Sequence, residues 1–395
     1  MKKIRSKIIL CALLVLFFGI LILLEQIISP TSGWAMLLSC LRMGSVFALI
    51  AVSMNLLNGF TGLFSLGQAG FMLIGAVTYS IFTIPLALRG SVYMYYDYAI
   101  KISFPEVLGN ALGGPGMIIG VLIAIILAGL TTAAAAFIIG LPALRLRSDY
   151  LAIATLGFAE IIRAVFMWGG LGPITNGSNA LRNFTRTSDF VMNIFGLSLT
   201  MGTTTIVIIA AACIFIIVLL VNSSYGRAFK AIREDEIAAE AMGINLYKHK
   251  QLSFCISSFF TGIGGALFAI FTGTIMARDF VAARTYEFLL IIVLGGIGSI
   301  SGSVIGAMLF VFASQWWLRW LDGGVISLFG NTVNLPNIVF RSGFRLVVFS
   351  FIIMCVVLFF RRGIMGDKEL PFVLNRWKTK ISGIARRPKA GESNG

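Results

Sequence analysis

The sequence has few charged residues. Only 12% of its 395 residues are charged, whereas 58% are hydrophobic. A soluble domain carries about a quarter charged residues. This composition excludes a soluble globular protein, because the chain lacks the polar residues needed to cover an aqueous surface. It predicts an all-α integral membrane protein.

Histidine and cysteine are also scarce. The only histidine is His249, and the five cysteines lie inside apolar runs without paired spacing. This pattern argues against a disulfide framework and against a metal site. An enzyme buried in the membrane would need a nucleophile–base set or a metal site. Since the sequence offers neither, we expect no enzymatic activity and no metal.

The apolar residues form runs long enough to cross a bilayer, which takes about 20 residues per helix. The basic segment 1–7 and the run after it resemble a signal peptide, but 25–33 holds no small-residue cleavage site. We therefore interpret that run as the first of about ten transmembrane helices. The predicted spans lie near 8–28, 34–57, 67–88, 116–141, 150–168, 203–221, 251–273, two within 286–320, and 344–360.

The net charge of +15 reflects orientation in the membrane rather than nucleic-acid binding. Of the 31 Lys and Arg residues, 20 fall in segments that ten crossings place on one side. Basic loops face the cytoplasm, so both termini are expected there. We expect a transmembrane domain over 1–360, with its longest polar loop at 222–250, and a basic cytoplasmic tail over 361–395. The tail is suited to anionic lipids or to a partner protein.

Two glycine-rich segments, 59–75 and 295–306, interrupt the apolar runs. Broken backbone at membrane depth is tolerated where it is buried in protein or lines a cavity. One such segment in each half is compatible with an inverted repeat and points to a solute path. Close helix packing explains most of the glycines better than solute contact does. The polar residues Thr61, Ser65 and Gln68 are candidates for the solute path.

Charged residues inside the spans are further candidates. Glu160 and Arg163 are three residues apart and share one helix face, so they can neutralise each other. They suit either a zwitterionic solute or a structural ion pair. Arg42 and Glu287 are weaker candidates, and Arg42 can extend its charge toward the membrane surface instead.

The polar loop 222–250 contains a short helix signal. Asp235 is suited to cap it, and Gly243 is a natural stop. Apolar residues at 232, 239, 242 and 246 form one stripe. Such a helix lies on the membrane surface or inserts into a groove of another protein. Its acidic residues disfavour an anionic membrane surface, which favours a protein partner.

The outer segment 89–115 carries four tyrosines between residues 93 and 98. They suit an interfacial aromatic belt or recognition of a partner protein. The second long outer segment covers 169–202.

Four segments, 58–75, 144–163, 226–245 and 294–299, occur in a characteristic order. Together they resemble the inner-membrane permease subunits of branched-chain amino acid ABC transporters, over about 41–360. The resemblance implies a second permease subunit, two ABC ATPase subunits and an extracytoplasmic solute-binding protein. The family also takes urea, short amides and related solutes.

The resemblance further implies that 233–243 is a coupling helix that docks on the ATPase. No glycine directly precedes a lysine, so the chain lacks a phosphate-binding loop. ATP is therefore expected on the partner, with no cofactor in this subunit. The alternative is a self-sufficient secondary transporter or channel that uses the charged residues inside the spans. The expected coupling residues are Arg233, Glu234, Glu236, Ala238, Ala239, Glu240, Ala241 and Gly243.

Overall fold

The structure, a computed structural model, describes residues 35–146, 148–186 and 202–317, with short pieces within 19–26, 191–200, 325–334, 348–354 and 363–366. The predicted spans near 8–28 and 344–360 and most of the tail 361–395 lie outside the described residues. The number of crossings and the side on which each terminus lies therefore stay predictions.

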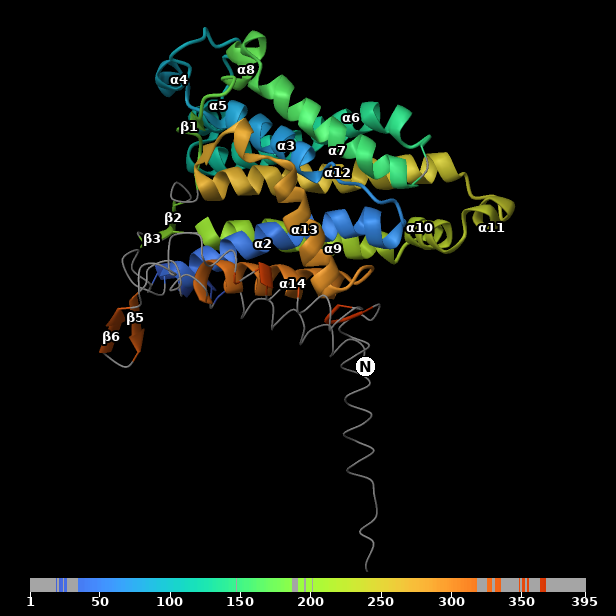
Figure 1. Cartoon of the computed structure of the whole chain (residues 1–395). Coiled ribbons are helices and arrows are strands. Elements are labelled where there is room, and N and C mark those ends of the chain that lie inside the picture. Colours follow the sequence, from blue (N-terminus) through green and yellow to red (C-terminus); the bar gives the residue numbers. More distant parts are fainter. Residues whose placement is uncertain are drawn as a thin grey trace, which may run out of the picture.

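The described part of the chain is a bundle of apolar helices (Figure 1). Within it, five helices are long and apolar enough to cross a bilayer, or six if one bent pair counts as a single span. A multi-pass membrane protein is thus confirmed. A shorter apolar helix, α3 (Gln68–Thr83), occupies the predicted run 67–88. The five long helices are α2 (Ala35–Asn55), which continues as the π-helix η1 (Leu56–Phe60), α6 (Gly114–Ala143), α7 (Ser148–Met167), α9 (Gly202–Val221) and α12 (Leu246–Thr272).

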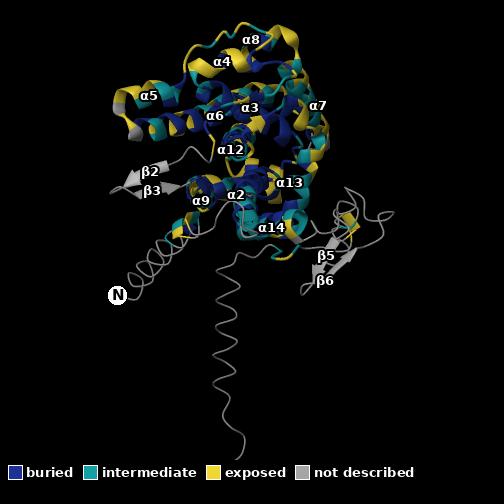
Figure 2. Cartoon of the chain, turned by 90° about the vertical axis from the view of Figure 1, so that its left-hand side faces the viewer, coloured by how far each residue is buried: buried dark blue, intermediate teal, exposed yellow. Residues whose placement is uncertain are grey.

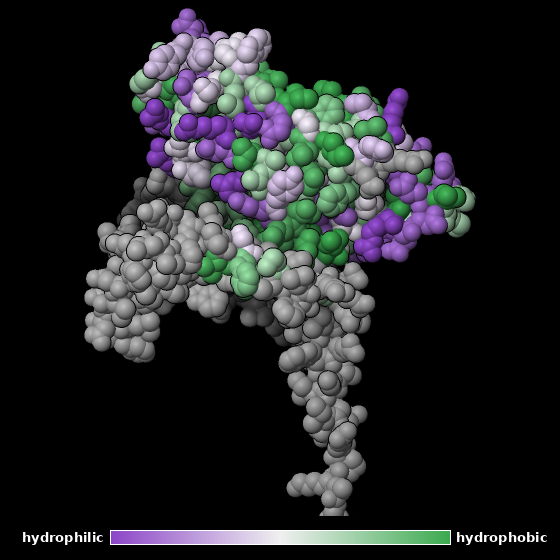
Figure 3. All heavy atoms as spheres, in the orientation of Figure 1, coloured by the Kyte–Doolittle hydropathy of each residue, from purple (hydrophilic) through white to green (hydrophobic). Residues whose placement is uncertain are grey.

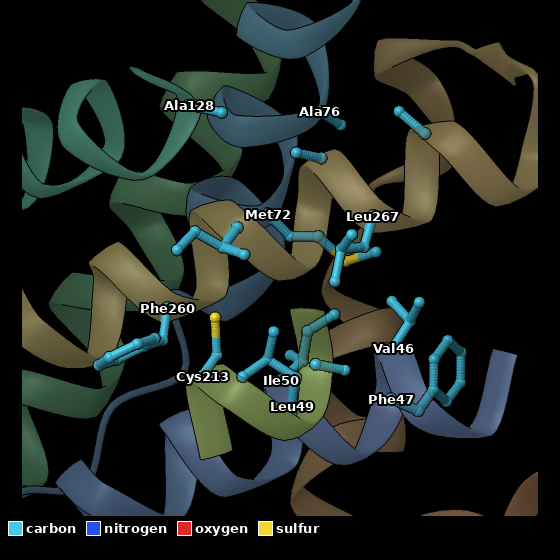
Figure 4. Packing of buried hydrophobic residues seen from close by; sticks show 14 of the residues in the cluster. Val46, Phe47, Leu49, Ile50, Met72, Ala76, Ala128, Cys213, Phe260 and Leu267 are labelled. Atoms are coloured by element: carbon cyan, nitrogen blue, oxygen red, sulfur yellow. The ribbon is translucent and has the colours of Figure 1, made fainter. Parts of the chain in front are cut away.

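Helix α2 lies at the centre of the bundle. All residues from 44 to 55 are buried, as expected for a helix that is apolar on every face. Figure 4 shows its side chains Phe47 and Ile50 in the same core as Leu267 of α12 and Cys213 of α9. By contrast, α7 lies at the edge of the bundle (Figure 2), and only 22% of its residues in Tyr150–Met167 are buried.

Glycines let α12 pack closely against its neighbours. A Cβ on Gly75 of α3 would overlap the backbone of Gly262 in α12, and one on Gly265 would overlap the carbonyl of Met72. Small residues at such crossings bring membrane helices together. Gly75, Gly262 and Gly265 therefore act in helix packing. For Gly75 this agrees with the packing interpretation of the first glycine-rich segment rather than with contact to a solute.

The second glycine-rich segment is a sharp break. Helix α13 (Ala282–Gly295) and α14 (Ile300–Phe312) are bent by 119°. α13 has 14 residues and rises about 21 Å at about 1.5 Å per residue. That is shorter than the roughly 30 Å hydrocarbon core. The predicted interruption is present and α13 is short, so the number of crossings within 286–320 stays a prediction. The π-helix η5 (Ala313–Trp317) continues α14.

A layer of short elements covers one end of the bundle: α4 (Leu86–Val92), α5 (Phe104–Leu112), η2 (Gly169–Leu171) and α8 (Gly172–Thr175). Arg89 is buried and donates to four carbonyls, those of Ile81, Ile84, Ile100 and Ile102. Tyr93 donates to the Ile174 carbonyl at 2.8 Å. Burial raises the pKa of Tyr93 to about 12, so its hydroxyl stays protonated at neutral pH.

This layer changes the interpretation of the tyrosines. Tyr93 is buried, whereas Tyr95 is 79% exposed, and Tyr96 packs against Gly172. Two of these residues therefore join the two outer segments to each other rather than forming a uniform surface belt.

Short strands are the feature that the sequence did not predict. They form three two-stranded antiparallel pairs in the described residues, and the first pair ties the segment after α8 to the end of α12. A 3-10 turn, η4 (Ala277–Asp279), then leads to α13. The strands are β1 (Leu181–Arg182) with β4 (Thr274–Ile275), β2 (Val191–Ile194) with β3 (Leu197–Thr200), and β5 (Val325–Leu328) with β6 (Asn331–Asn334).

Candidate functional site: the loop helix and the two glycine-rich breaks

The loop after α9 forms two short helices, α10 (Ser224–Glu234) and α11 (Glu236–Ala241). They lie at one end of the bundle (Figure 1). The Asp235 carboxylate accepts from the backbone N–H groups of Ile237 and Ala238 at 2.8 and 3.0 Å. Gly243 has a φ of +85°, a backbone conformation that favours glycine. Both the predicted cap and the predicted stop are confirmed.

The apolar stripe expected on this loop is divided between two faces. Ile232 and Ala239 are buried, whereas Met242 is 84% exposed and Ile237 is 82% exposed. Figure 3 shows the hydrophilic surface of this end next to the apolar middle of the bundle. α11 therefore presents two large apolar side chains among acidic ones. Of the predicted coupling residues, Ala239 is buried and the others are exposed: Arg233, Glu234, Glu236, Ala238, Glu240, Ala241 and Gly243.

Arg233 points inward, toward the first glycine-rich break. Its guanidinium donates to the Gly59 carbonyl at 2.8 Å and to the Glu234 carboxylate at 3.1 Å. A Cβ on Gly298, in the second break, would come within 3.0 Å of the Arg233 guanidinium. Arg233 thus connects the loop with both breaks.

Asn55 joins the two breaks directly. It is fully buried, and its amide donates to the Ser299 carbonyl at 3.0 Å and to the Ser303 hydroxyl at 2.8 Å. Its side-chain oxygen accepts from the Gly298 N–H at 2.9 Å. Three bonds from one amide hold the end of α2 against the bend between α13 and α14.

Gln68 belongs to a buried polar network. Its oxygen accepts from the Thr261 hydroxyl at 2.7 Å, and its amide lies 3.4 Å from the Ser257 hydroxyl. Ser257 in turn donates to the Ser53 carbonyl at 2.6 Å. The network joins α2, α3 and α12, and buried polar groups need such partners.

Thr61 and Ser65 are also buried. Thr61 donates to the Leu56 carbonyl at 3.1 Å. The backbone N–H of Ser65 donates to the Asn58 side chain at 3.2 Å. In the described structure, Thr61 and Ser65 therefore stabilise the backbone of the first break through bonds to nearby residues in the chain.

Glu160 and Arg163 form the ion pair expected from their spacing. The Arg163 Nη2 and the Glu160 Oε2 lie 2.6 Å apart, and the side chains are 28% and 39% exposed. No recorded bond in the described structure joins this pair to the Gln68 network. α13 carries a second pair, Arg284 with Glu287, at 3.0 Å.

Arg42 is held inside the bundle. It donates to the Thr203 hydroxyl at 2.6 Å and lies 3.8 Å from the Glu25 carboxylate. Glu25 also accepts from the backbone N–H groups of Thr203 and Thr204, at the start of α9. Arg42 therefore has structural partners at the start of α9.

Three features of this site were not predicted from the sequence: the buried bonds of Asn55, the exposure of Ile237 and the exposure of Met242. Asn55 lies in an apolar run four residues before Gly59, and an amide in such a run signals a required partner. Ile237 follows the capping Asp235 among acidic residues, which is an unusual place for a large apolar side chain.

These features describe a multi-pass helical membrane protein whose polar loop contacts two broken segments. A family model described as "Branched-chain amino acid transport system / permease component" matches residues 36–358. The chain belongs to this family, as its motifs predicted. Members are permease components, so the chain is not an enzyme.

Three curated relatives are similar to the chain. The high-affinity branched-chain amino acid transport system permease proteins LivM of Escherichia coli (strain K12) and Salmonella typhimurium are each 30% identical, over 68% and 69% of the chain and 61% of the relative. A probable branched-chain amino acid transport permease protein LivM of Methanocaldococcus jannaschii is 25% identical over 67% of the chain and 76% of the relative. The chain thus spans about three fifths of the first two relatives. No solved structure matches the chain.

Proposed function

We propose that this chain is the pore-forming subunit of an ABC importer in the cytoplasmic (inner) membrane. Its solute would be a branched-chain amino acid or a similar small amino-acid-like molecule. The names of the relatives support the solute class. A second permease subunit, ABC ATPase subunits that bind the ATP, and an extracytoplasmic solute-binding protein complete the proposed assembly. Both termini and the loop 222–250 then face the cytoplasm.

The observation that carries the proposal is the position of Arg233. α11 lies beyond the apolar bundle, where a soluble partner reaches it, while Arg233 at its base bonds to Gly59 and approaches Gly298. A displacement of the loop is therefore transmitted to both breaks by a short path. Since Asn55 joins the breaks to each other, they move together.

We assign docking to the exposed side of α11. Ile237 and Met242 supply apolar contacts, and Glu240 supplies a negative charge between them. Exposed apolar residues surrounded by polar ones mark protein interaction sites. Ala239, which is buried, serves in this scheme to seat α11 on the body of the protein.

We propose that the solute path has two parts. The first is the glycine-rich break that contains Thr61, Ser65 and Gln68. The second is the partly exposed ion pair of Glu160 and Arg163 on α7. The second permease would pack against such an exposed apolar helix. A zwitterionic solute that passes along this face meets one charge of each sign.

Co-purification tests the proposal. The tagged chain is isolated in mild detergent together with the neighbouring transporter subunits, and the ATPase is quantified by mass spectrometry. We expect Gly243→Pro and Glu240→Arg to lose the ATPase and solute uptake while the protein stays in the membrane. Asp279→Arg, an exposed charge reversal at the opposite end of α12, is the matched control for ATPase binding.

A different result would favour the alternative. A chain that remains alone while its uptake continues without ATP would be a secondary transporter. Glu160 and Arg163 would then be the first residues to test for ion coupling.

A further inference from the structure

A cavity lies beside the loop, next to the coupling path described above. It lies between α9, α10 and α14, and its volume is about 780 Å³. That is within the range of about 300–1,000 Å³ found for small-molecule sites. The cavity is too large to be a packing defect, so it can hold a ligand.

The deep wall of the cavity is apolar. α9 contributes Ile214 and Val218, and α14 contributes Val304 and Ile305. All four residues are half-buried and belong to the apolar, membrane-crossing part of these helices. Apart from Ser301 and Asn222, which also line the cavity, this part is hydrocarbon, so it fits an acyl chain.

The mouth of the cavity is basic. Lys230, Arg233 and Glu234 line it, which gives two positive charges and one negative charge. Glu234 already pairs with Arg233 at 3.1 Å. The Lys230 ammonium lies 5.5 Å from the centroid of the Phe60 ring, and no ion pair recorded among the described residues includes it. Lys230 is thus available to bind an anion.

The order of these features along the helices indicates the ligand. The basic mouth belongs to α10, which follows the end of the apolar helix α9 at Val221, whereas the apolar wall belongs to α9 and α14 themselves. Basic pockets between transmembrane helices bind lipid headgroups. A free anion would occupy only the mouth and leave the wall uncovered. A lipid with a negative headgroup matches both parts.

We infer that this cavity binds one anionic phospholipid. Its phosphate lies at Lys230 and Arg233, and an acyl chain follows Val218 and Val304. Because Gly298 also lines the cavity, the bound lipid bridges α10 and the second break. The site requires only that α9 and α14 cross a bilayer, so it does not depend on the proposed coupling to an ATPase.

Native mass spectrometry of the full chain tests the inference. The protein is released from detergent with phosphatidylglycerol or with phosphatidylcholine, and the retained lipids are counted. We expect one phosphatidylglycerol to be retained in preference to phosphatidylcholine. Lys230→Gln should remove this preference and Lys230→Arg should keep it. Lys248→Gln, an exposed lysine outside the cavity, is the matched control.

A second variant tests the apolar wall. Val304→Trp fills the cavity without altering its charge, and we expect it to lose the bound phosphatidylglycerol. Ile305→Gln, which makes the wall polar, replaces it if the tryptophan prevents folding in a thermal melt. Unchanged phosphatidylglycerol retention in Lys230→Gln would overturn the inference. So would displacement of the lipid by equimolar inorganic phosphate, since that would show a site for any soluble anion.

Discussion

Replacement of Arg233 by methionine should separate docking from transmission. Methionine keeps much of the side-chain length but cannot donate to Gly59, so the 2.8 Å bond is lost. A hydrogen bond from a charged group contributes about 1.5–3 kcal/mol. A coupling free energy of that size corresponds to roughly a 10- to 150-fold change in the coupled equilibrium. The exposed residues of α11 are unchanged, so the ATPase should still bind.

The assay is transport by the whole complex in proteoliposomes, with solute uptake and ATP hydrolysis measured together. We expect Arg233→Met to lower the amount of solute moved per ATP by about tenfold or more. Arg227→Met is the matched control, because Arg227 lies on the same helix and its guanidinium donates to the exposed Ser224 hydroxyl at 2.9 Å rather than to a glycine-rich break. Arg233→Lys should recover part of the loss, since lysine keeps the charge.

Two results would refute this reasoning. A normal ratio of solute to ATP in Arg233→Met would show that the bond to Gly59 does not transmit motion. Loss of the ATPase from the purified complex would show that Arg233 acts in docking rather than behind it.

Three further predictions concern other contacts. Asn55→Ala should lower the thermal midpoint and transport together, because it removes three buried hydrogen bonds worth about 1 kcal/mol each, while Asn110→Ala on an exposed helix should change neither. Glu160→Gln combined with Arg163→Gln should retain more transport than either single change if the pair is structural; a double variant as inactive as the worse single variant would place the pair in the solute path. Tyr93→Phe should destabilise the outer layer by about 1 kcal/mol, measurable as faster proteolysis of 86–112, without loss of ATPase binding; unchanged proteolysis would mean that the bond to Ile174 is not needed there.

The sequence predicted the elements of this molecule better than their mutual contacts. Apolar length alone located α2, α6, α7, α9 and α12, because a bilayer requires about the same length from each span. The same rule does not decide the role of α13. There the glycines at 295 and 296 end the helix after 14 residues, and composition does not reveal whether a short apolar helix crosses the membrane or turns back.

Candidate solute residues illustrate the same limit. Gln68 was selected because a polar residue beside a break needs a partner or water. The structure supplies the partner from α12, 193 residues later in the chain. A single sequence does not show which distant helix packs beside Gln68. The need for a hydrogen-bond partner could therefore be predicted, but its identity as Thr261 could not. The three bonds of Asn55 were missed for the same reason.

In the loop 222–250, the helix cap could be predicted from the sequence, but the orientation of the apolar residues could not. A cap depends on residues two or three positions away, and Asp235 bonds to Ile237 and Ala238. The direction of an apolar stripe depends on what lies beneath the helix. α11 is so short that Ala239 alone faces the body of the protein, which leaves Ile237 and Met242 outside. Their exposure has a cost in water, and contact with a partner surface would remove it. The inward position of Arg233 and the outward position of these two side chains therefore assign opposite sides of one loop to transmission and docking.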